Sequence, residues 1–244
     1  MRRCILIGLA LALVAPANAV GAGRIHEHSS ARDSVERRGA PLAPSTAQRA
    51  AAARLDARTT WNRFGTPRSL FKPAGWLADG LASDARVAAR EFVRRNAALY
   101  RLSAADVSAL AVVADHRLGS DAHVVTFEQR FGDLPTAGSG LVSVGVVGGK
   151  VAYASSSLGG SGALQGERRL TAQDAWLTAA RNAGVEADAG DIGVAPSRAG
   201  FGQLRVAGLT ELQQVREVAV PTPRNGVRRA FEANVVDNGR EPLA

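Results

Sequence analysis

Three groups of residues have types and spacings that could support chemistry. His26-Glu27-His28 places two imidazoles two residues apart, but no third zinc ligand lies nearby. His116 and His123 flank Gly119-Ser120-Asp121, which is typical of a hairpin loop, so we interpret both histidines as exposed turn residues. Gly159 to Ala163 approaches the nucleophile elbow of hydrolases, but no helix follows at once, and we interpret this segment as a flexible linker.

Other catalytic signatures are missing from the sequence. It contains no His-Glu-x-x-His, the motif in which two histidines one helical turn apart bind zinc and a glutamate acts as base. Neither glycine-serine tract has the lysine and spacing of a phosphate-binding loop. Because no nucleophile, base and orienting group can be named together, we predict no catalytic residues, no bound metal and no cofactor in this chain.

The N-terminus has the features of a secretory signal peptide. Met1-Arg2-Arg3 is cationic, Cys4 to Val14 is apolar, and Ala17-Asn18-Ala19 is a small-x-small cleavage site, so we predict residues 1–19 to be removed after Ala19. The apolar run is too short to span a bilayer. We therefore expect a secreted, extracellular chain that contacts no membrane after signal removal. Removal also takes away the only cysteine, which excludes disulfides.

The charge is basic but diffuse. The 244-residue chain has 30 Lys+Arg against 22 Asp+Glu, a formal net charge of +8. Only Lys72 and Lys150 are lysines, and the arginines are spread along the chain. This distribution indicates a composition bias and not a phosphate-binding patch, so we predict no nucleic-acid partner.

The first predicted helix runs from Ser83 to about Tyr100. Ser83 is a suitable N-cap, and Asp84 adds negative charge to the first turn. One face of the helix is mainly apolar and carries Ala85, Ala88, Ala89, Phe92, Asn96 and Leu99. The opposite face carries Arg86, Arg90 and Arg94, which form a candidate partner surface, although such stripes are most often simply hydrated.

Strands follow this helix. In the run 124–131, Val125, Phe127, Gln129 and Phe131 share one face of a period-2 strand. The runs 141–147 and 150–155 flank Gly148-Gly149, and paired glycines supply the positive φ angles that a two-residue hairpin needs. Upstream, Ser103 and Asp106 have capping-box spacing before a predicted strand at 109–114.

The second half repeats this order. Residues 156–169 are rich in glycine and serine and mark a boundary, and Thr171 then begins a helix that ends at Gly184. Strand-like runs follow at 203–207, 215–220 and 228–236. We predict an α+β fold in which a helix packs on an antiparallel sheet in each of two halves. Residues 237–244 carry no signal for a closing element, so we expect the second domain to be truncated.

Residues 87–160 resemble the FTP propeptide domain of secreted fungalysin- and thermolysin-type zinc metallopeptidases. The resemblance rests on the helix sequence Ala-Ala-Arg-Glu-Phe-Val, on Leu-Tyr-Arg-Leu-Ser after it, and on a Gly-Lys-Val hairpin. It also rests on a family motif made of Phe127, Gln129, Gly132, Leu134 and Pro135. The upstream segment 61–67 is similar to the lead-in of bacterial precursors, and residues 170–236 are similar, more weakly, to a PepSY region.

The residues predict a signal peptide (1–19) and a mobile, disordered lead-in (20–58). The resemblance implies an FTP-like domain (59–160) and a PepSY-like domain (161–244), both with cystatin-like folds. It also implies a function. The chain would be the prosegment that inhibits a zinc metallopeptidase catalytic domain and acts as its folding chaperone, without that domain being present. A free-standing exported binding module, or an inhibitor acting in trans, is the alternative.

Overall fold

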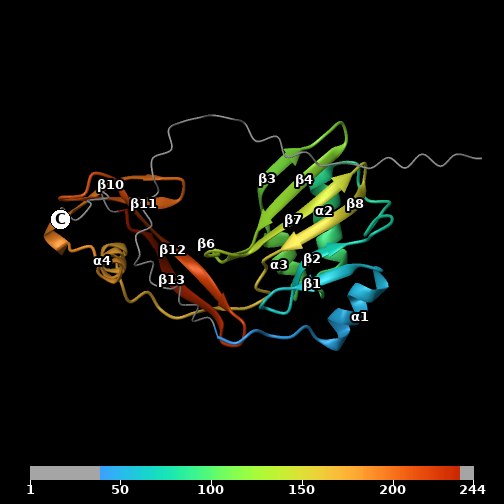
Figure 1. Cartoon of the computed structure of the whole chain (residues 1–244), viewed down its shortest axis with the longest axis horizontal. Coiled ribbons are helices and arrows are strands. Elements are labelled where there is room, and N and C mark those ends of the chain that lie inside the picture. Colours follow the sequence, from blue (N-terminus) through green and yellow to red (C-terminus); the bar gives the residue numbers. More distant parts are fainter. Residues whose placement is uncertain (1–38, 237–244) are drawn as a thin grey trace, which may run out of the picture. The chain divides into compact units, whose positions relative to one another are not determined.

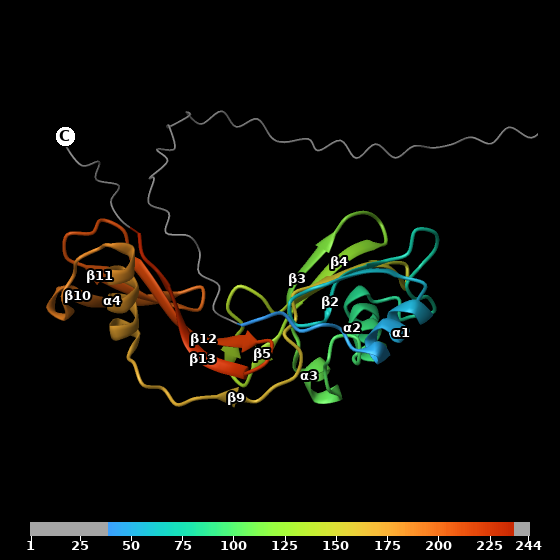
Figure 2. The same cartoon turned by 60° about the horizontal axis from the view of Figure 1, so that its bottom comes forward.

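The computed structural model of the chain describes residues 39–236, which form an α+β fold with helices packed on antiparallel sheets, as predicted (Figures 1 and 2). The predicted signal peptide with its cleavage site at Ala19, the His26–His28 motif and residues 237–244 lie outside the described residues. Within residues 39–236, no helix combines the length and the apolarity needed to cross a membrane.

The first half is a six-stranded antiparallel sheet in the order β1-β2-β8-β7-β4-β3. Its strands are β1 (Arg58–Trp61), β2 (Pro67–Phe71), β3 (Ala111–Arg117), β4 (Ala122–Glu128), β7 (Leu141–Val147) and β8 (Lys150–Ser156). Helix α2 (Ala85–Arg95) packs on one face of this sheet, against β4, β7 and β8. The core between them includes Phe92, Val125, Phe127 and Val144, so the predicted apolar face of the helix and the inward positions of Val125 and Phe127 are confirmed. The predicted 124–131 strand is too long, because β4 ends at Glu128 and Phe131 lies in a separate short strand that contributes to another core cluster.

Helix α2 is shorter than the sequence predicts. Asp84, not Ser83, is the N-cap, because its Oδ1 accepts a hydrogen bond from the backbone N–H of Val87 at 2.9 Å. The helix ends at Arg95, since Asn96 leaves the helical conformation and its side-chain amide donates to the carbonyl of Phe92 at 2.9 Å. This early end turns the chain toward the short helix α3 (Ala104–Ala109), whose capping box from Ser103 is confirmed.

The prediction of a mobile lead-in up to residue 58 is wrong for its last part, which forms a helix packed on the first core. Helix α1 (Thr46–Arg54) begins at a capping box formed by Ser45 and Gln48. Gln48 is buried, and its side-chain amide donates to the carbonyls of Gly65 and Leu99, each at 2.8 Å. Ala52 belongs to the same core as Phe92. The sequence did not predict this contact because it joins segments far apart in the chain.

The second half is a five-stranded sheet in the order β10-β11-β12-β13-β9. Its elements are β9 (Leu164–Gln165), α4 (Ala172–Ala183), the 3-10 helix η1 (Ala189–Asp191), β10 (Ile192–Arg198), β11 (Phe201–Val206), β12 (Gln213–Thr222) and β13 (Gly226–Asn234). The four consecutive strands are antiparallel, and β9 pairs parallel with β13. Helix α4 packs on β12 and β13 with Trp176 fully buried.

The predictions for this half are mostly confirmed. The capping box from Thr171 and the end of α4 at Gly184 are observed, and β11, β12 and β13 fall within a few residues of the predicted strands. Strand β10 was not predicted. It is an edge strand whose Val194 is 88% exposed, so it lacks the alternation that marks a half-buried strand.

Candidate functional site

The family-motif residues lie where the first half contacts the second. Phe127 is part of the first core, and Gln129 follows it with only 2% of its surface exposed. The Gln129 side-chain amide donates to the carbonyl of Gly160 at 2.8 Å, and its Oε1 accepts from the N–H of Gly159 at 3.1 Å. The hydroxyl of Thr136 donates to the Gln129 carbonyl at 2.7 Å. Gln129 therefore holds two chain segments in place, which explains a polar residue at an inward position.

The rest of the motif forms a small hairpin. Strands β5 (Arg130–Phe131) and β6 (Leu134–Pro135) enclose Gly132 in the turn. Phe131 and Leu134 form a third core cluster with Ala219 and Val227 of the second sheet. Thr136 also forms a parallel bridge with Ala219. Leu134 of the motif, with its neighbours Phe131 and Thr136, thus attaches the first half to the second sheet through apolar and backbone contacts.

The segment 159–163 is packed, so its interpretation as a flexible linker is wrong. A Cβ added to Gly159 would lie 2.5 Å from Cβ of Pro221, and one added to Gly162 would lie 2.9 Å from Cγ2 of Val227. These approaches require glycine, because any side chain would overlap a neighbour. The glycines that suggested flexibility are present for close packing.

Ser161 within this segment is not an activated nucleophile. Its hydroxyl donates to Oδ2 of Asp106, which also accepts from the hydroxyl of Ser103 at 2.5 Å and from the Ser103 N–H at 2.8 Å. Burial would raise the pKa of Asp106, but the hydrogen bonds from Ser103 and Ser161 outweigh it and lower that pKa. A carboxylate of lowered pKa is a weak base, so this pair serves to cap helix α3 and fix the segment.

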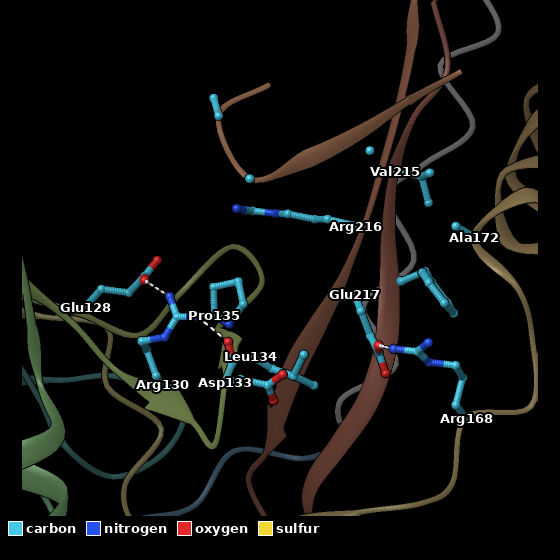
Figure 3. A pocket seen from close by; sticks show the side chains of 14 residues that line it. Glu128, Arg130, Asp133, Leu134, Pro135, Arg168, Ala172, Val215, Arg216 and Glu217 are labelled. Carbon is cyan, nitrogen blue, oxygen red and sulfur yellow. Dashed lines mark hydrogen bonds and ion pairs between the residues drawn. The ribbon is translucent and has the colours of Figure 1, made fainter. Parts of the chain in front are cut away.

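A groove of about 580 Å³ lies beside the β5–β6 hairpin (Figure 3). Strand β11 pairs with β12 as far as Val215, and the bridge from Thr136 meets β12 again at Ala219. Residues 216–218 of β12 pair with β13 on one side. On the other side, between Val215 and Ala219, they have no strand partner among the described residues. The lining comes from the hairpin, β12 and the start of α4, and includes Glu128, Arg130, Asp133, Pro135, Arg168, Arg216 and Glu217.

Most of the charged side chains that line the groove form ion pairs with residues of the groove or next to it. Arg130 contacts Glu128 at 3.2 Å, and Arg216 contacts Glu232 at 2.7 Å. Glu217 binds both Arg168 and Arg229. Burial acts to raise the pKa of Glu217, but the two guanidinium groups outweigh it and lower that pKa. The groove therefore presents fixed charges of both signs next to an open strand edge, a combination suited to binding an extended polypeptide.

The predicted cationic stripe on α2 is only partly free. Arg90 donates to the carbonyls of Val107 and Leu110 at 2.8 and 2.9 Å, and its guanidinium lies 4.8 Å from the ring centroid of Phe127. Arg86 pairs with Asp115 at 2.8 Å, and Arg94 lies 3.8 Å from Glu91. Because each of the three arginines contacts another group of the chain, the stripe is a weaker candidate surface than the sequence indicated.

The two histidines lie on strands, not in the turn between them. His116 is exposed on β3, and His123 is on β4. Nδ1 of His123 lies 2.8 Å from Oδ1 of Asp115, whose other oxygen accepts from Arg86. Asp115 therefore connects α2, β3 and β4. The sequence did not single it out, because its partners are 29 and 8 residues away.

We expect the Asp115 contacts to make stability depend on acid pH. Hydrogen bonds from His123 and Arg86 lower the pKa of Asp115, so its contribution is present above the unfolded pKa, about 3.9, and is lost as pH falls through the folded value. Asp115→Asn should lower the free energy of unfolding by about 1 kcal/mol at pH 7, and by less at pH 3, below the unfolded pKa. Urea denaturation at both pH values measures this, with exposed Asp79→Asn as control. An equal loss at both pH values would contradict it.

Comparison with known proteins gives no assignment. A scan against protein-family models found no match to this chain, and a search of curated proteins found no similar one. Within residues 39–236, no cluster of three or more histidine, cysteine, aspartate or glutamate side chains could hold a metal ion.

Proposed function

We propose that this chain is the prosegment of a secreted zinc metalloendopeptidase and acts as its inhibitor and intramolecular folding chaperone. One observation supports this most. Within the segment that carries the family resemblance, Leu134 and its neighbours Phe131 and Thr136 join the two helix-on-sheet halves, and Gln129 fixes the segment between them. A chain joined in this way can offer a preformed surface drawn from both halves to one folded partner.

The physical basis is mass action. A preformed surface binds the folded enzyme and not its unfolded chain, so binding stabilises the enzyme by RT ln(1 + [L]/Kd) while it covers the active-site cleft. The groove offers a place for an extended segment of the partner, because the side of β12 away from β13 has no strand partner at 216–218. The charged side chains there, Arg216 and Glu217, already form ion pairs. The proposal assigns no catalytic step to this chain.

Inhibition of a purified thermolysin-type zinc endopeptidase tests the proposal. Residues 20–244 at micromolar excess should reduce cleavage of a small fluorogenic peptide by at least about ten-fold. A serine endopeptidase assayed in parallel should be unaffected, which separates specific binding from competition by a digestible protein. Equal loss of both activities, or no loss of either, would overturn the proposal for this class of enzyme.

Refolding tests the chaperone role separately. Denatured metalloendopeptidase should regain more activity when diluted into the chain, followed by proteolytic removal of the chain, than when diluted into buffer. Binding without inhibition and without improved refolding would instead favour a free-standing exported binding module.

A further inference from the structure

Residues 166–170 connect β9 to α4 and form a strap along the second half (Figure 2). Every residue of the strap is exposed, and none belongs to a helix or strand. Within the described part of the chain, only Arg168 bonds to anything outside the strap, through its ion pair with Glu217 (Figure 3). A Cβ added to Gly166 would meet nothing within 4 Å. The strap is therefore held at a single point.

The strap packs loosely on the elements next to it. A cavity of about 390 Å³ is lined by strap residues and by residues of α4 and β13, including Ala175, Thr178 and Phe231. Leu170, the only aliphatic side chain of the strap, is 47% exposed and belongs to none of the core clusters. Segments with few buried apolar contacts open locally at little cost in free energy, and exposed loops are preferred sites of proteolysis.

The strap also contains two consecutive arginines, Arg168 and Arg169. Residues 39–236 contain two further Arg-Arg pairs, at 94–95 within α2 and at 228–229 within β13. An endopeptidase acts on an opened, extended segment, which a helix or a paired strand supplies only after local unfolding. Within the described range, the strap is thus the one exposed, irregular segment that carries paired arginines.

The two arginines of the strap differ in availability. Arg168 is held by Glu217, whose carboxylate also binds Arg229. Arg169 is exposed and has no hydrogen-bond or ion-pair partner among the described residues. An endopeptidase with a carboxylate in its specificity pocket recognises a guanidinium group through charge-assisted hydrogen bonds. Arg169 presents that group unpaired, and the bond that follows it joins Arg169 to Leu170.

We propose that the Arg169–Leu170 bond is a processing site for an endopeptidase that cleaves after arginine, and that cleavage there separates the two halves. Water is the co-reactant. The C–N bond between the two residues breaks, the carbonyl carbon of Arg169 becomes a carboxylate, and the nitrogen of Leu170 leaves as an ammonium group. The processing enzyme supplies the catalytic groups, and this chain supplies the substrate bond.

Few contacts hold the halves together once the strap is cut. The main ones are the cluster around Phe131 and Leu134, the two-residue pairing of β9 with β13, and the bridge from Thr136 to Ala219. A stable interface engages about 20–30 residues on each side, many more than these. In the intact chain the strap keeps each half at a local concentration on the order of millimolar around the other, and cleavage removes this contribution.

Limited proteolysis of residues 20–244 with trace trypsin tests the site. Intact-mass spectrometry should show the 169–170 bond cleaved at least about ten-fold faster than any other bond between residues 39 and 236. Arg169→Gln should slow cleavage of the strap at least about ten-fold, because the remaining arginine is held in an ion pair. Arg168→Gln should not slow it. Arg95→Gln changes the second arginine of the pair in α2 and, as matched control, should stay within about two-fold.

Size-exclusion chromatography tests the separation. Fragments 20–169 and 170–244 should elute apart at micromolar concentration without denaturant, and co-elution would overturn the proposed separation. Faster cleavage at another bond between residues 39 and 236 would overturn the assigned site. Equal slowing by Arg168→Gln and Arg169→Gln would also overturn it. Far-UV circular dichroism shows that each variant is folded.

The consequence for inhibition rests on the proposed function. If the intact chain inhibits a zinc endopeptidase, the separated fragments should inhibit it with a constant at least about ten-fold higher. If the strap is cleaved and the fragments separate but the intact chain does not inhibit, only the proposed function fails. The serine endopeptidase used as control for inhibition should accordingly be one that does not cleave after arginine.

Discussion

Replacing Trp176 with alanine is expected to lower the free energy of unfolding by about 3–5 kcal/mol. Trp176 is fully buried between α4 and the second sheet, against Leu204, Val206 and Val215. Its Nε1 donates to the carbonyl of Asn234 at 3.3 Å. Alanine would leave a large cavity and remove this hydrogen bond.

Urea denaturation followed by far-UV circular dichroism measures the loss, because the signal does not depend on the tryptophan that is removed. Trp76→Ala is the matched control. Trp76 is 38% exposed, and Nζ of Lys150 lies 5.4 Å from its ring centroid. We expect this control to lose no more than about 1 kcal/mol. Equal losses in the two variants would contradict the assigned core.

The position of the damage is also predicted. Trp176 belongs to a core cluster that shares no residue with the cluster around Phe92. Amide hydrogen exchange in the Trp176→Ala variant should therefore accelerate in β11, β12 and β13, while β4 and β7 remain protected. Uniform acceleration throughout both halves would show that they unfold as one unit.

Replacing Gln129 with leucine is expected to cost about 2–4 kcal/mol of folding free energy. Leucine has a similar size but leaves the N–H of Gly159 and the carbonyl of Gly160 without their partner. Each unpaired buried backbone group costs about 1–3 kcal/mol. The cost arises from a junction between two segments about 30 residues apart, and not from local strand structure.

Gln214→Leu provides the comparison for this variant. Gln214 is also a strand glutamine, but its Oε1 accepts only from the exposed side chain of Asn234, at 3.0 Å. We expect a loss below about 1 kcal/mol for this change. Hydrogen exchange at the Gly159 amide, whose N–H donates to Gln129, should increase in Gln129→Leu alone. If both variants lose the same stability, Gln129 does not hold the junction.

Elements that depend on local physics were predictable. The capping boxes of α3 and α4 lie where Ser103 and Thr171 indicate, because a cap involves residues only three positions apart. The β7–β8 hairpin turns at Gly148 and Gly149, whose φ angles are +52° and +74°. Both ends of helix α2 were predicted wrongly. Asp84 caps the N-terminus in place of Ser83, and Asn96 ends the helix by bonding the carbonyl of Phe92.

The amino-acid sequence by itself determined the α+β class, the inward faces of α2, β4 and α4, and the unusual inward polar residue Gln129. These features could be predicted because hydrophobic periodicity and helix capping depend only on residues a few positions apart. Only the tertiary structure decided what Gln129 binds, why Gly159 must be glycine, and which side chains align across neighbouring strands. These features depend on strand register and on contacts between distant segments, which no local pattern encodes.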